Sequence, residues 1–437
     1  MIRPDRRVGK PGRAILRRHL SNRPAAVYPV SMDTVPVIVL KPREEDRLLA
    51  GHPWVYDNEI ASAEGLEGAS PGAEVRIRAS RGRILGRGLW SPSSKIRVRR
   101  YSFRDEAFDE ALVLRRVTGA IDLRRRFFDP AADSFRAVFA EADGLPGLIV
   151  DRYVGEGDAG VRGSWLVVQF LCAGADARRD TILGVLSRVL APDGIMERSD
   201  SPVRRLEGLE QRAGVVAGSV PGRVVIVENG LRFGADLAAG QKTGWFMDQR
   251  ANRAAVAGFA RGRKVLDAFC NAGGFALAAA AAGAASVLGV DSSPEAVAAV
   301  RDNAALNGLA DVEALEANAF DFLREAGAHD ARYGLVVLDP PAFAKNRASL
   351  DGAIRGYKEI NLRGMRLLDD GGVLATFSCS FWLPRERFID VLEDAAADAG
   401  VRLRYLSELG QAPDHPVVSG YRESRYLKGF ILEVERR

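Results

Sequence analysis

Cysteine and histidine are scarce in this chain of 437 residues, which holds three cysteines and four histidines. Cys172, Cys270 and Cys379 are far apart in the sequence, which predicts a reducing, cytoplasmic location without disulfide bonds. The histidines are also scattered, and neither residue type shows the spacing of zinc ligands. We therefore expect no metal site.

Long apolar segments are also lacking. One uncharged run, residues 268–290, contains Asn271 and four glycines and is rich in alanine. A bilayer-spanning helix needs about 20 consecutive, largely apolar residues, whereas this run is predicted to divide into a turn, a helix and a strand. No membrane partner is expected.

Acidic residues are missing from residues 76–104, which contain ten Arg or Lys. Alternation such as Val75-Arg76-Ile77-Arg78 predicts strands with cations on one face and apolar side chains on the other. A solvated strand face is the alternative reading, but a block of one sign with aromatic residues nearby favours contact with RNA phosphates. The predicted RNA contacts in this block are Arg76, Arg78, Arg97, Arg99 and Arg100.

Residues 264–291 are the most informative segment: an apolar strand, a glycine turn, a small-residue helix, and a second strand ending in Asp291. Gly273 lets the backbone approach a ligand, and the acid can bind two ribose hydroxyls. The turn starts with Asp267 and lacks the G-x-G-x-x-G spacing that seats a pyrophosphate. A carboxylate there suits the ammonium and sulfonium of S-adenosylmethionine. We therefore interpret the segment as an S-adenosylmethionine site. The alternatives are a dinucleotide site and a glycine turn that only allows close packing.

Strands and helices alternate from this segment to the C-terminus, which predicts a mainly parallel sheet covered by helices. Predicted helices cover residues 294–307, 320–327, 357–368 and 384–399, and predicted strands cover 312–317, 334–339, 373–378, 402–406 and 426–434. Ligands gather at the carboxyl ends of such strands. The polar residues expected there are Asp267, Asp291, Asn318, Asp339 and Cys379.

Two of these strand ends carry reactive groups. Asp339-Pro340-Pro341-Ala342-Phe343 ends one strand with prolines that cannot continue the ladder, and Cys379 follows the next strand. A thiolate that adds to carbon 6 of cytosine makes carbon 5 nucleophilic toward a methyl group. Asp339 is expected to hydrogen-bond N3 of the ring, and Phe343 to stack on an extruded base. The alternative for Cys379 is a small buried hydrophobe.

The chain resembles the three-domain bacterial 23S ribosomal RNA cytosine-5 methyltransferases that carry an N-terminal PUA domain. The matching segments cover nearly everything after Met32 and include Gly51-His52-Pro53-Trp54 and Thr243-Gly244-Trp245-Phe246-Met247-Asp248-Gln249-Arg250. Further matches lie at residues 41–42, 267–274, 339–343, 355–358, 377–380, 414–416 and 426–430.

The resemblance implies an α/β fold with a C-terminal Rossmann-like class I methyltransferase sheet, residues 231–437. A small β-rich, PUA-like RNA-binding domain at 32–107 and an α+β middle domain at 108–230 would precede it. Cys379 and Asp339 would be catalytic. The implied S-adenosylmethionine ligands are Gln249, Asp267, Phe269, Asn271, Gly273, Asp291, Ser292, Asn318, Ala319 and Asp339.

Two positions depart from related RNA cytosine-5 methyltransferases. Many of them have a second cysteine where this chain has Ala342, so another base must remove the carbon-5 proton. Asn318 stands where an acid is usual, and its amide can still accept a hydrogen bond from the adenine amino group. The expected partner is ribosomal RNA, and a homodimer is left open.

Residues 1–31 hold eight Arg or Lys and one acid. They are read as a basic disordered arm, a targeting sequence, or untranslated sequence before a true start at Met32. The last reading is favoured, because the family-like sequence starts there.

Two rival functions stay open. The Asp339 motif also resembles that of methyltransferases acting on exocyclic amines or guanine, which need no thiol. An RNA-binding ribosome-assembly factor with a vestigial cofactor pocket is the other rival.

Overall fold

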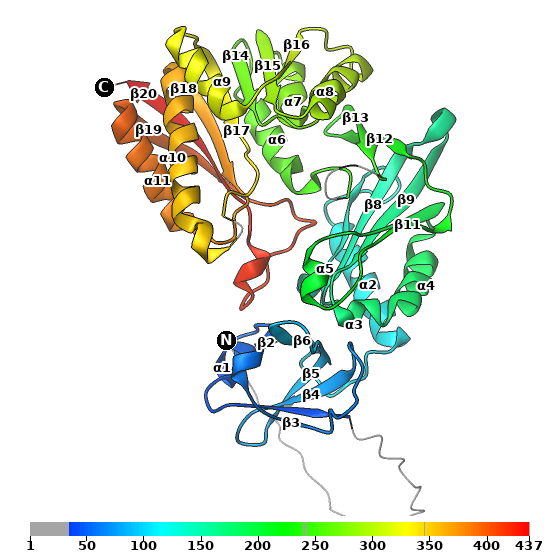
Figure 1. Ribbon diagram of the computed structural model, residues 1–437. Helices are drawn as coiled ribbons and strands as arrows, with labels where there is room; N and C mark the ends of the chain where they lie inside the picture. The colour runs from blue at the N-terminus through cyan, green and yellow to red at the C-terminus, as the bar shows by residue number, and fades with distance from the viewer. Residues whose placement is uncertain (1–34, 239, 241–242, 345, 437) are drawn as a thin grey trace, which may run out of the picture. The chain divides into compact units, whose positions relative to one another are not determined.

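The computed structural model describes residues 35–436 except 239, 241, 242 and 345. In chain order these residues form three β-sheets, each with its own helices (Figure 1). The basic segment 1–31, for which three readings were given, lies outside the described residues. No helix in the described part of the chain has the length and apolar character needed to cross a bilayer.

The first sheet has six strands in the order β2-β6-β5-β4-β1-β3. Its core is made by alternating side chains such as Val75, Ile77 and Val98, which are fully buried, as the apolar–basic alternation predicts. The elements are β1 (Val37–Leu40), α1 (Glu45–Leu49), β2 (Trp54–Tyr56), β3 (Ile60–Glu64), β4 (Glu74–Arg78), β5 (Ile84–Trp90) and β6 (Ile96–Ser102).

The second sheet has the order β11-β10-β9-β8-β12-β13, with β7 paired to β8. Its strands are β7 (Phe135–Phe139), β8 (Leu148–Glu156), β9 (Arg162–Phe170), β10 (Gly194–Ser199), β11 (Arg212–Gly218), β12 (Arg223–Glu228) and β13 (Leu231–Asp236). The helices are α2 (Glu110–Arg124), α3 (Ala173–Asp176), α4 (Arg179–Leu190) and α5 (Val203–Leu206). The predicted domain boundary at 230/231 lies in the turn between β12 and β13, which pair with each other.

Strand β9 is apolar on both faces of this sheet. Leu166 and Val168 pack toward α2 and α4, while Trp165 and Val167 belong to a second core that continues into the C-terminal part of the chain. Strand β10 was not predicted, because its sequence Gly-Ile-Met-Glu-Arg-Ser reads as polar. It is nevertheless wholly buried, and an ion pair between Glu197 and Arg179 neutralises one of its charges.

The third sheet has the order β16-β15-β14-β17-β18-β20-β19, and its first five strands are parallel. The strands are β14 (Lys264–Ala268), β15 (Ser286–Asp291), β16 (Val312–Glu316), β17 (Tyr333–Leu338), β18 (Leu368–Ser378), β19 (Val401–Leu409) and β20 (Lys428–Arg436). The helices are α6 (Arg250–Ala257), α7 (Gly274–Ala281), α8 (Pro294–Leu306), α9 (Ala319–Ala328), α10 (Leu350–Leu367) and α11 (Arg385–Ala399). The chain order reverses between β14 and β17, where open α/β sheets bind ligands.

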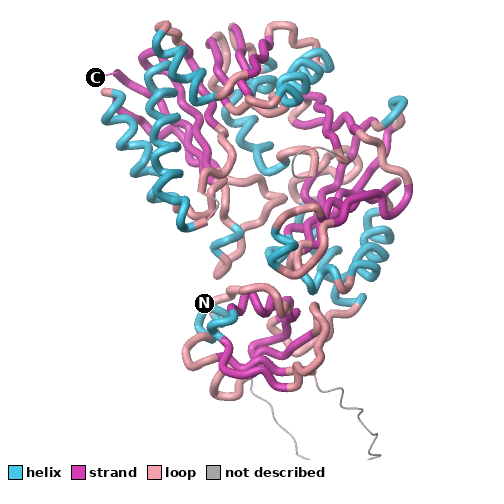
Figure 2. Tube along the Cα trace, in the orientation of Figure 1, coloured by secondary structure: helices cyan, strands magenta, loops and turns pink. Residues whose placement is uncertain are grey.

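Helices cover both faces of the third sheet, which confirms the predicted α/β class (Figure 2). Val265 of β14 packs with α6, α7 and α8 on one face, and its neighbour Leu266 packs with α9, α10 and α11 on the other. The prediction that the helix after β17 starts at residue 357 was wrong, because α10 begins at Leu350. A short 3₁₀ turn, η5 (Arg347–Ser349), leads directly into α10. Asn346 caps this turn, and its side chain accepts a hydrogen bond from the Ser349 N–H.

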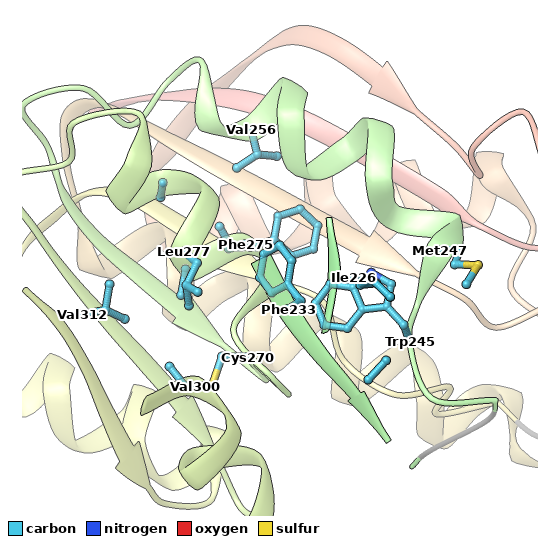
Figure 3. Close-up of a cluster of buried hydrophobic side chains, with 14 of the residues drawn as sticks. Ile226, Phe233, Trp245, Met247, Val256, Cys270, Phe275, Leu277, Val300 and Val312 are labelled. Carbon is cyan, nitrogen blue, oxygen red and sulfur yellow. The ribbon is translucent and has the colours of Figure 1, made fainter. Parts of the chain in front are cut away.

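One apolar cluster joins the second and third sheets (Figure 3). Phe233 of β13 and Trp245 lie with ring centroids 4.6 Å apart, and Phe275 of α7 belongs to the same cluster. Residues 243–249, including the short 3₁₀ helix η4 (Met247–Gln249), pass from this cluster into α6.

A buried ion pair holds this junction. Glu228, the last residue of β12, accepts hydrogen bonds from Arg253 Nε at 2.6 Å, Arg253 Nη2 at 2.9 Å and Trp245 Nε1 at 2.9 Å. Burial alone would raise the pKa of Glu228, but the charge and hydrogen bonds of Arg253 outweigh it and lower the pKa. The carboxylate therefore stays ionised in the folded protein.

We predict that Glu228→Ala lowers the free energy of unfolding by about 3–5 kcal/mol, because it leaves the Arg253 guanidinium buried without its carboxylate. Urea unfolding measures this. Glu156→Ala is the matched control, since its pair with Arg232 is nearly half exposed and should contribute about 0–1 kcal/mol. Equal losses in the two variants would show that Glu228 does not hold the junction.

Candidate active site

The turn between β14 and α7 has an unusual backbone. Phe269, Asn271 and Gly273 adopt positive φ angles of 68°, 47° and 83°. A bulky residue such as Phe269 rarely adopts this conformation, and such strain is concentrated at ligand sites. At Gly273 a Cβ atom would lie 2.7 Å from Leu277, so the tight turn needs glycine for space as well as conformation.

Asp291 is held by this turn at the end of β15. Its Oδ2 accepts a hydrogen bond from the Asn271 N–H at 2.9 Å, and its Oδ1 accepts from the Ser293 N–H at 3.0 Å. A carboxylate oxygen has two lone pairs, so each oxygen keeps one for a further donor. The half-buried carboxylate can thus accept from two adjacent hydroxyl groups. The neighbouring Ser292 is exposed.

Asp267, in β14, has an incompletely satisfied carboxylate. The residue is fully buried, its Oδ2 accepts from the Ala276 N–H at 3.0 Å, and its Oδ1 has no hydrogen-bond partner. Burial, with the negative charges of Asp339 and Asp291, raises its pKa well above the ordinary value. A cationic ligand would reverse this destabilisation, so the site fits the ammonium and sulfonium of S-adenosylmethionine.

Gln249 lies at the start of α6, the helix that packs against α7, which follows the β14–α7 turn. It is buried, one helical turn before Arg253. The Arg253 side chain lies over the first residue of α7, where a Cβ at Gly274 would be 2.7 Å from its Cδ. No direct hydrogen bond between Gln249 and the described residues of the turn is found.

Asn318 and Ala319 begin α9. Asn318 caps the helix, and its Oδ1 accepts hydrogen bonds from the Phe320 and Asp321 N–H groups at 3.0 and 3.4 Å. Both lone pairs of Oδ1 are then used. The prediction that this oxygen accepts from the adenine amino group therefore disagrees with the structure, and the amide N–H donors of Asn318 are what it can offer a ligand.

The thiol and the proline loop meet as predicted. Cys379, which follows β18, is partly exposed, and its Sγ lies 3.9 Å from the Pro340 carbonyl oxygen. Ser380 connects the same two segments, because its Oγ accepts from the Ala344 N–H at 3.1 Å and lies 2.9 Å from the Tyr357 hydroxyl. Asp339 and Cys379 therefore belong to one rigid assembly at adjacent strand ends.

Aromatic rings run from the β14–α7 turn to this loop. Phe320 lies between Phe269, at 6.1 Å between ring centroids, and Phe343, at 5.7 Å. Phe343 also packs against Tyr357 at 4.6 Å. Its ring is therefore half-buried and immobilised, which suits a wall of a base pocket more than a freely exposed stacking platform.

The predicted RNA contacts are not equally accessible. Arg99 has only 9 % exposure, and it pairs with Glu141 at 2.8 Å and Glu207 at 3.0 Å. Arg100 is also buried and donates to the carbonyl oxygens of His52 and Leu85, and burial lowers its pKa to about 10. Both arginines are thus engaged within the protein, and Arg99 pairs with carboxylates from elsewhere in the chain, which strand alternation does not reveal. Contact of the two arginines with RNA stays a prediction.

The other three predicted contacts lie nearer the surface. Arg76 pairs with Asp105, and Arg78 pairs with Glu64. Arg97 donates to the Pro92 carbonyl oxygen and lies over the Trp90 ring.

Sequence reasoning missed a cavity of about 540 Å³ that we call the basic cavity, because three arginines in its lining (Arg100, Arg115 and Arg116) outnumber two acids (Glu141 and Asp143). Arg115 and Arg116 line it beside Phe103, which is 67 % exposed. Arg116 donates to the Tyr101 carbonyl oxygen at 3.3 Å, while its buried Nε has no partner. Burial and the nearby Arg115 charge lower its pKa. An anion in this cavity would give the Nε donor an acceptor and would stabilise the charged form of Arg116.

No group of three or more metal-ligating side chains is found among the described residues.

Comparison with known proteins agrees with this geometry. A family model described as S-adenosylmethionine-dependent methyltransferase matches residues 213–427, and one described as PUA-like domain matches residues 38–103. Ribosomal RNA large subunit methyltransferase I of Alteromonas mediterranea is 40 % identical over 401 residues, which are 91 % of this chain and 98 % of that protein. The protein of the same name from Shewanella denitrificans is 42 % identical over 405 residues, with 91 % and 99 % covered.

Two solved structures share the fold. One comes from Streptococcus mutans, and the other is SMU.776 in complex with SAH; each has a TM-score of 0.77 and covers 91 % of this chain and 99 % of its own. Their identities to this chain are 20 % and 21 %, so they support the fold alone.

The raised pKa of Asp267 makes the folding stability of the protein depend on pH. Because the folded state binds the carboxyl proton more tightly than the unfolded chain, stability falls as pH rises above the unfolded-state pKa and Asp267 ionises in the fold. We predict that Asp267→Asn stabilises the cofactor-free protein near neutral pH by about 1–3 kcal/mol and weakens binding of S-adenosylmethionine.

Calorimetry over a pH series tests this. The affinity of the wild type for S-adenosylmethionine should rise with pH as Asp267 ionises, and Asp267→Asn should lose that slope. Asp394→Asn, an exposed acid of α11, should change neither quantity. Unchanged affinity in Asp267→Asn would exclude a cation-binding role for this carboxylate.

Proposed function

Because the chain belongs to the ribosomal RNA large subunit methyltransferase I family, which uses S-adenosylmethionine, we propose that it methylates carbon 5 of a cytosine in 23S ribosomal RNA. Cys379 would act as the covalent nucleophile. The observation that carries this proposal is the thiol at the end of β18, joined to the Asp339 strand end through Pro340 and Ser380. An amine methyltransferase has no chemical need for a thiol there.

Each protein group has a defined part in the proposed reaction. The Cys379 thiolate forms a bond to carbon 6, and the displaced ring electrons reach N3, which takes a proton from Asp339. Carbon 5 then carries the electron pair that accepts the methyl group, which S-adenosylmethionine supplies. Loss of the carbon-5 proton to a base expels the thiolate, and N3 returns its proton to Asp339, which restores the neutral aromatic ring.

The cofactor would be held by the carboxylates of the β14–α7 turn. The free lone pairs of Asp291 suit the ribose hydroxyls, and the unsatisfied Oδ1 of Asp267 suits the charged end of the ligand. Gly273 would allow the backbone to approach it, and the N–H of Ala319, in the first turn of α9, would face the adenine.

The second candidate is methylation of an exocyclic amine or a guanine. The Asp339-Pro340-Pro341 segment with Phe343 in an aromatic wall favours it, since such a loop can hold a planar base without covalent attack. Mass mapping of modified nucleotides in ribosomal RNA from cells with and without this gene separates the two reactions.

We also propose that RNA phosphates occupy the cavity beside Arg115, Arg116 and Phe103. The buried Nε of Arg116, which has no hydrogen-bond partner, supports this proposal, because a buried donor without an acceptor is destabilised until an anion supplies one. An exposed aromatic ring beside the cations suits a stacked base.

For the basic cavity we expect Arg116→Gln to weaken RNA binding and to reduce the log–log salt slope by about 0.7, the contribution of one phosphate contact to a single strand. Arg301→Gln is the matched control, because Arg301 also donates to one carbonyl oxygen, that of Ala314, but lies on α8. Identical slopes for the two variants would mean that no phosphate enters the cavity.

The covalent step predicts a trapped adduct. With 5-fluorocytosine at the target position, the enzyme should be held on RNA after methyl transfer, because fluorine cannot leave as a cation. Cys379→Ser should prevent the adduct, since a hydroxyl is far less ionised and less nucleophilic than a thiol. Denaturing electrophoresis measures it.

Cys270→Ser is the control, because burial raises the pKa of the Cys270 thiol and keeps it unreactive. An adduct with Cys379→Ser, or its loss only in Cys270→Ser, would move the nucleophile elsewhere.

A further inference from the structure

Lys428 lies beside the strand end that carries Cys379. It opens β20 and is paired with Ser378 across the β18–β20 ladder. Its side chain is 8 % exposed, and Nζ donates to the carbonyl oxygens of Ser380 at 2.7 Å and Tyr426 at 2.9 Å. An ammonium has three donors, so one remains after these two bonds.

Burial and the Cys379 thiol are the two influences on this ammonium that come from the described residues. Its two hydrogen-bond acceptors are carbonyl groups, and burial lowers the pKa of Lys428 to about 8. Negative charge on Cys379 acts in the opposite direction and raises this pKa. The coupling is reciprocal, since two interacting groups shift each other by the same free energy. The ammonium therefore favours the thiolate as much as the thiolate favours the ammonium.

The described neighbours of Cys379 also include a phenol and a carbonyl group. Tyr357 of α10 carries a neutral phenol whose pKa is raised first by burial and also by a Cys379 thiolate. On the β17 side the Sγ atom lies 3.9 Å from the Pro340 carbonyl oxygen, and Asp339 precedes this proline in the chain. Carbonyl oxygens and carboxylates disfavour a nearby anion, whereas Lys428 of β20 supplies a positive charge.

We propose that Lys428 is a positioning residue whose ammonium stabilises the Cys379 thiolate, the form that adds to cytosine carbon 6. This role rests on the proposed cytosine-5 reaction. The S–H bond breaks with loss of the thiol proton to solvent, and the ammonium keeps its three protons, so the positive charge on Lys428 offsets the new negative charge on sulfur. When the sulfur is expelled at the end of the reaction, the thiolate returns to the same ammonium.

The direct test is alkylation of the three cysteines by iodoacetamide over a pH series, without RNA, read for each cysteine by peptide mass mapping. In Lys428→Met the midpoint for Cys379 should move up by at least about one pH unit, with reaction near neutral pH about tenfold slower. Lys428→Arg, which keeps the charge, should restore most of the wild-type midpoint.

Two kinds of control accompany the measurement. Lys264→Met removes an exposed ammonium that lies over the Tyr333 ring and should leave the Cys379 midpoint unchanged. The buried Cys172 is an internal reference, since burial raises the pKa of its thiol to about 11. A Cys379 midpoint in folded Lys428→Met equal to that of the wild type would overturn the proposal.

A reverse measurement avoids substitution of Lys428 and applies if Lys428→Met does not fold. Titration of the Lys428 amine by NMR of labelled lysine should give a lower pKa in Cys379→Ser than in the wild type, because the thiolate is gone. An equal pKa in the two proteins would overturn the proposal as well.

Neither measurement uses RNA, so their outcome is separate from that of the trapping experiment. A shifted alkylation midpoint without a trapped adduct would refute the cytosine-5 reaction, while a trapped adduct with no shift would refute the role of Lys428.

Discussion

The buried contact between Glu228 and Arg253 is the interaction on which the site depends most. The carboxylate ends β12 in the second sheet, and the guanidinium belongs to α6, which packs against the third sheet. Arg253 also lies over Gly274 at the start of α7. One ion pair thus connects the middle of the chain to the turn that contains Asn271 and Gly273. It can do so because the apolar cluster around Trp245 excludes water and strengthens the electrostatic attraction.

A second network fixes the reacting groups relative to one another. The Oγ of Ser380 accepts a hydrogen bond from the Ala344 N–H and shares one with the Tyr357 hydroxyl of α10, and the Ser380 carbonyl oxygen accepts from Lys428. Three elements therefore hold the residue next to Cys379. Such a fully connected set of polar groups keeps a nucleophile in place without relying on a flexible loop. This network buries the Lys428 ammonium, which is unfavourable. The pKa of Lys428 is therefore lowered by burial and raised by negative charge on the thiol.

Arginine in this protein is divided between structural and surface positions. Arg99, Arg124 and Arg204 are buried and pair with carboxylates. Basic composition therefore overstates the charge that RNA can reach, and the alternation of strand β6 led to Arg99 and Arg100 being misplaced on the surface. At the cavity Arg100 of β6 is joined by Arg115 and Arg116 of α2, whose sequence contains no basic run long enough to attract notice. Arg116 stands out only because its Nε is left without a partner.

The sequence by itself determined the order of strands and helices in the C-terminal sheet and the positions of Asp267, Asp291, Asp339 and Cys379 at strand ends. Apolar periodicity, prolines and glycines are local signals, and parallel strands bring their carboxyl ends to one edge. The structure alone decided the pairing of β20 with β18, which brings Lys428 to a thiol some fifty positions earlier in the chain. It also decided the burial of β10 and of Arg99, and the use of Asn318 as a helix cap. These depend on partners distant in sequence, whose effect on solvation and charge no local pattern records.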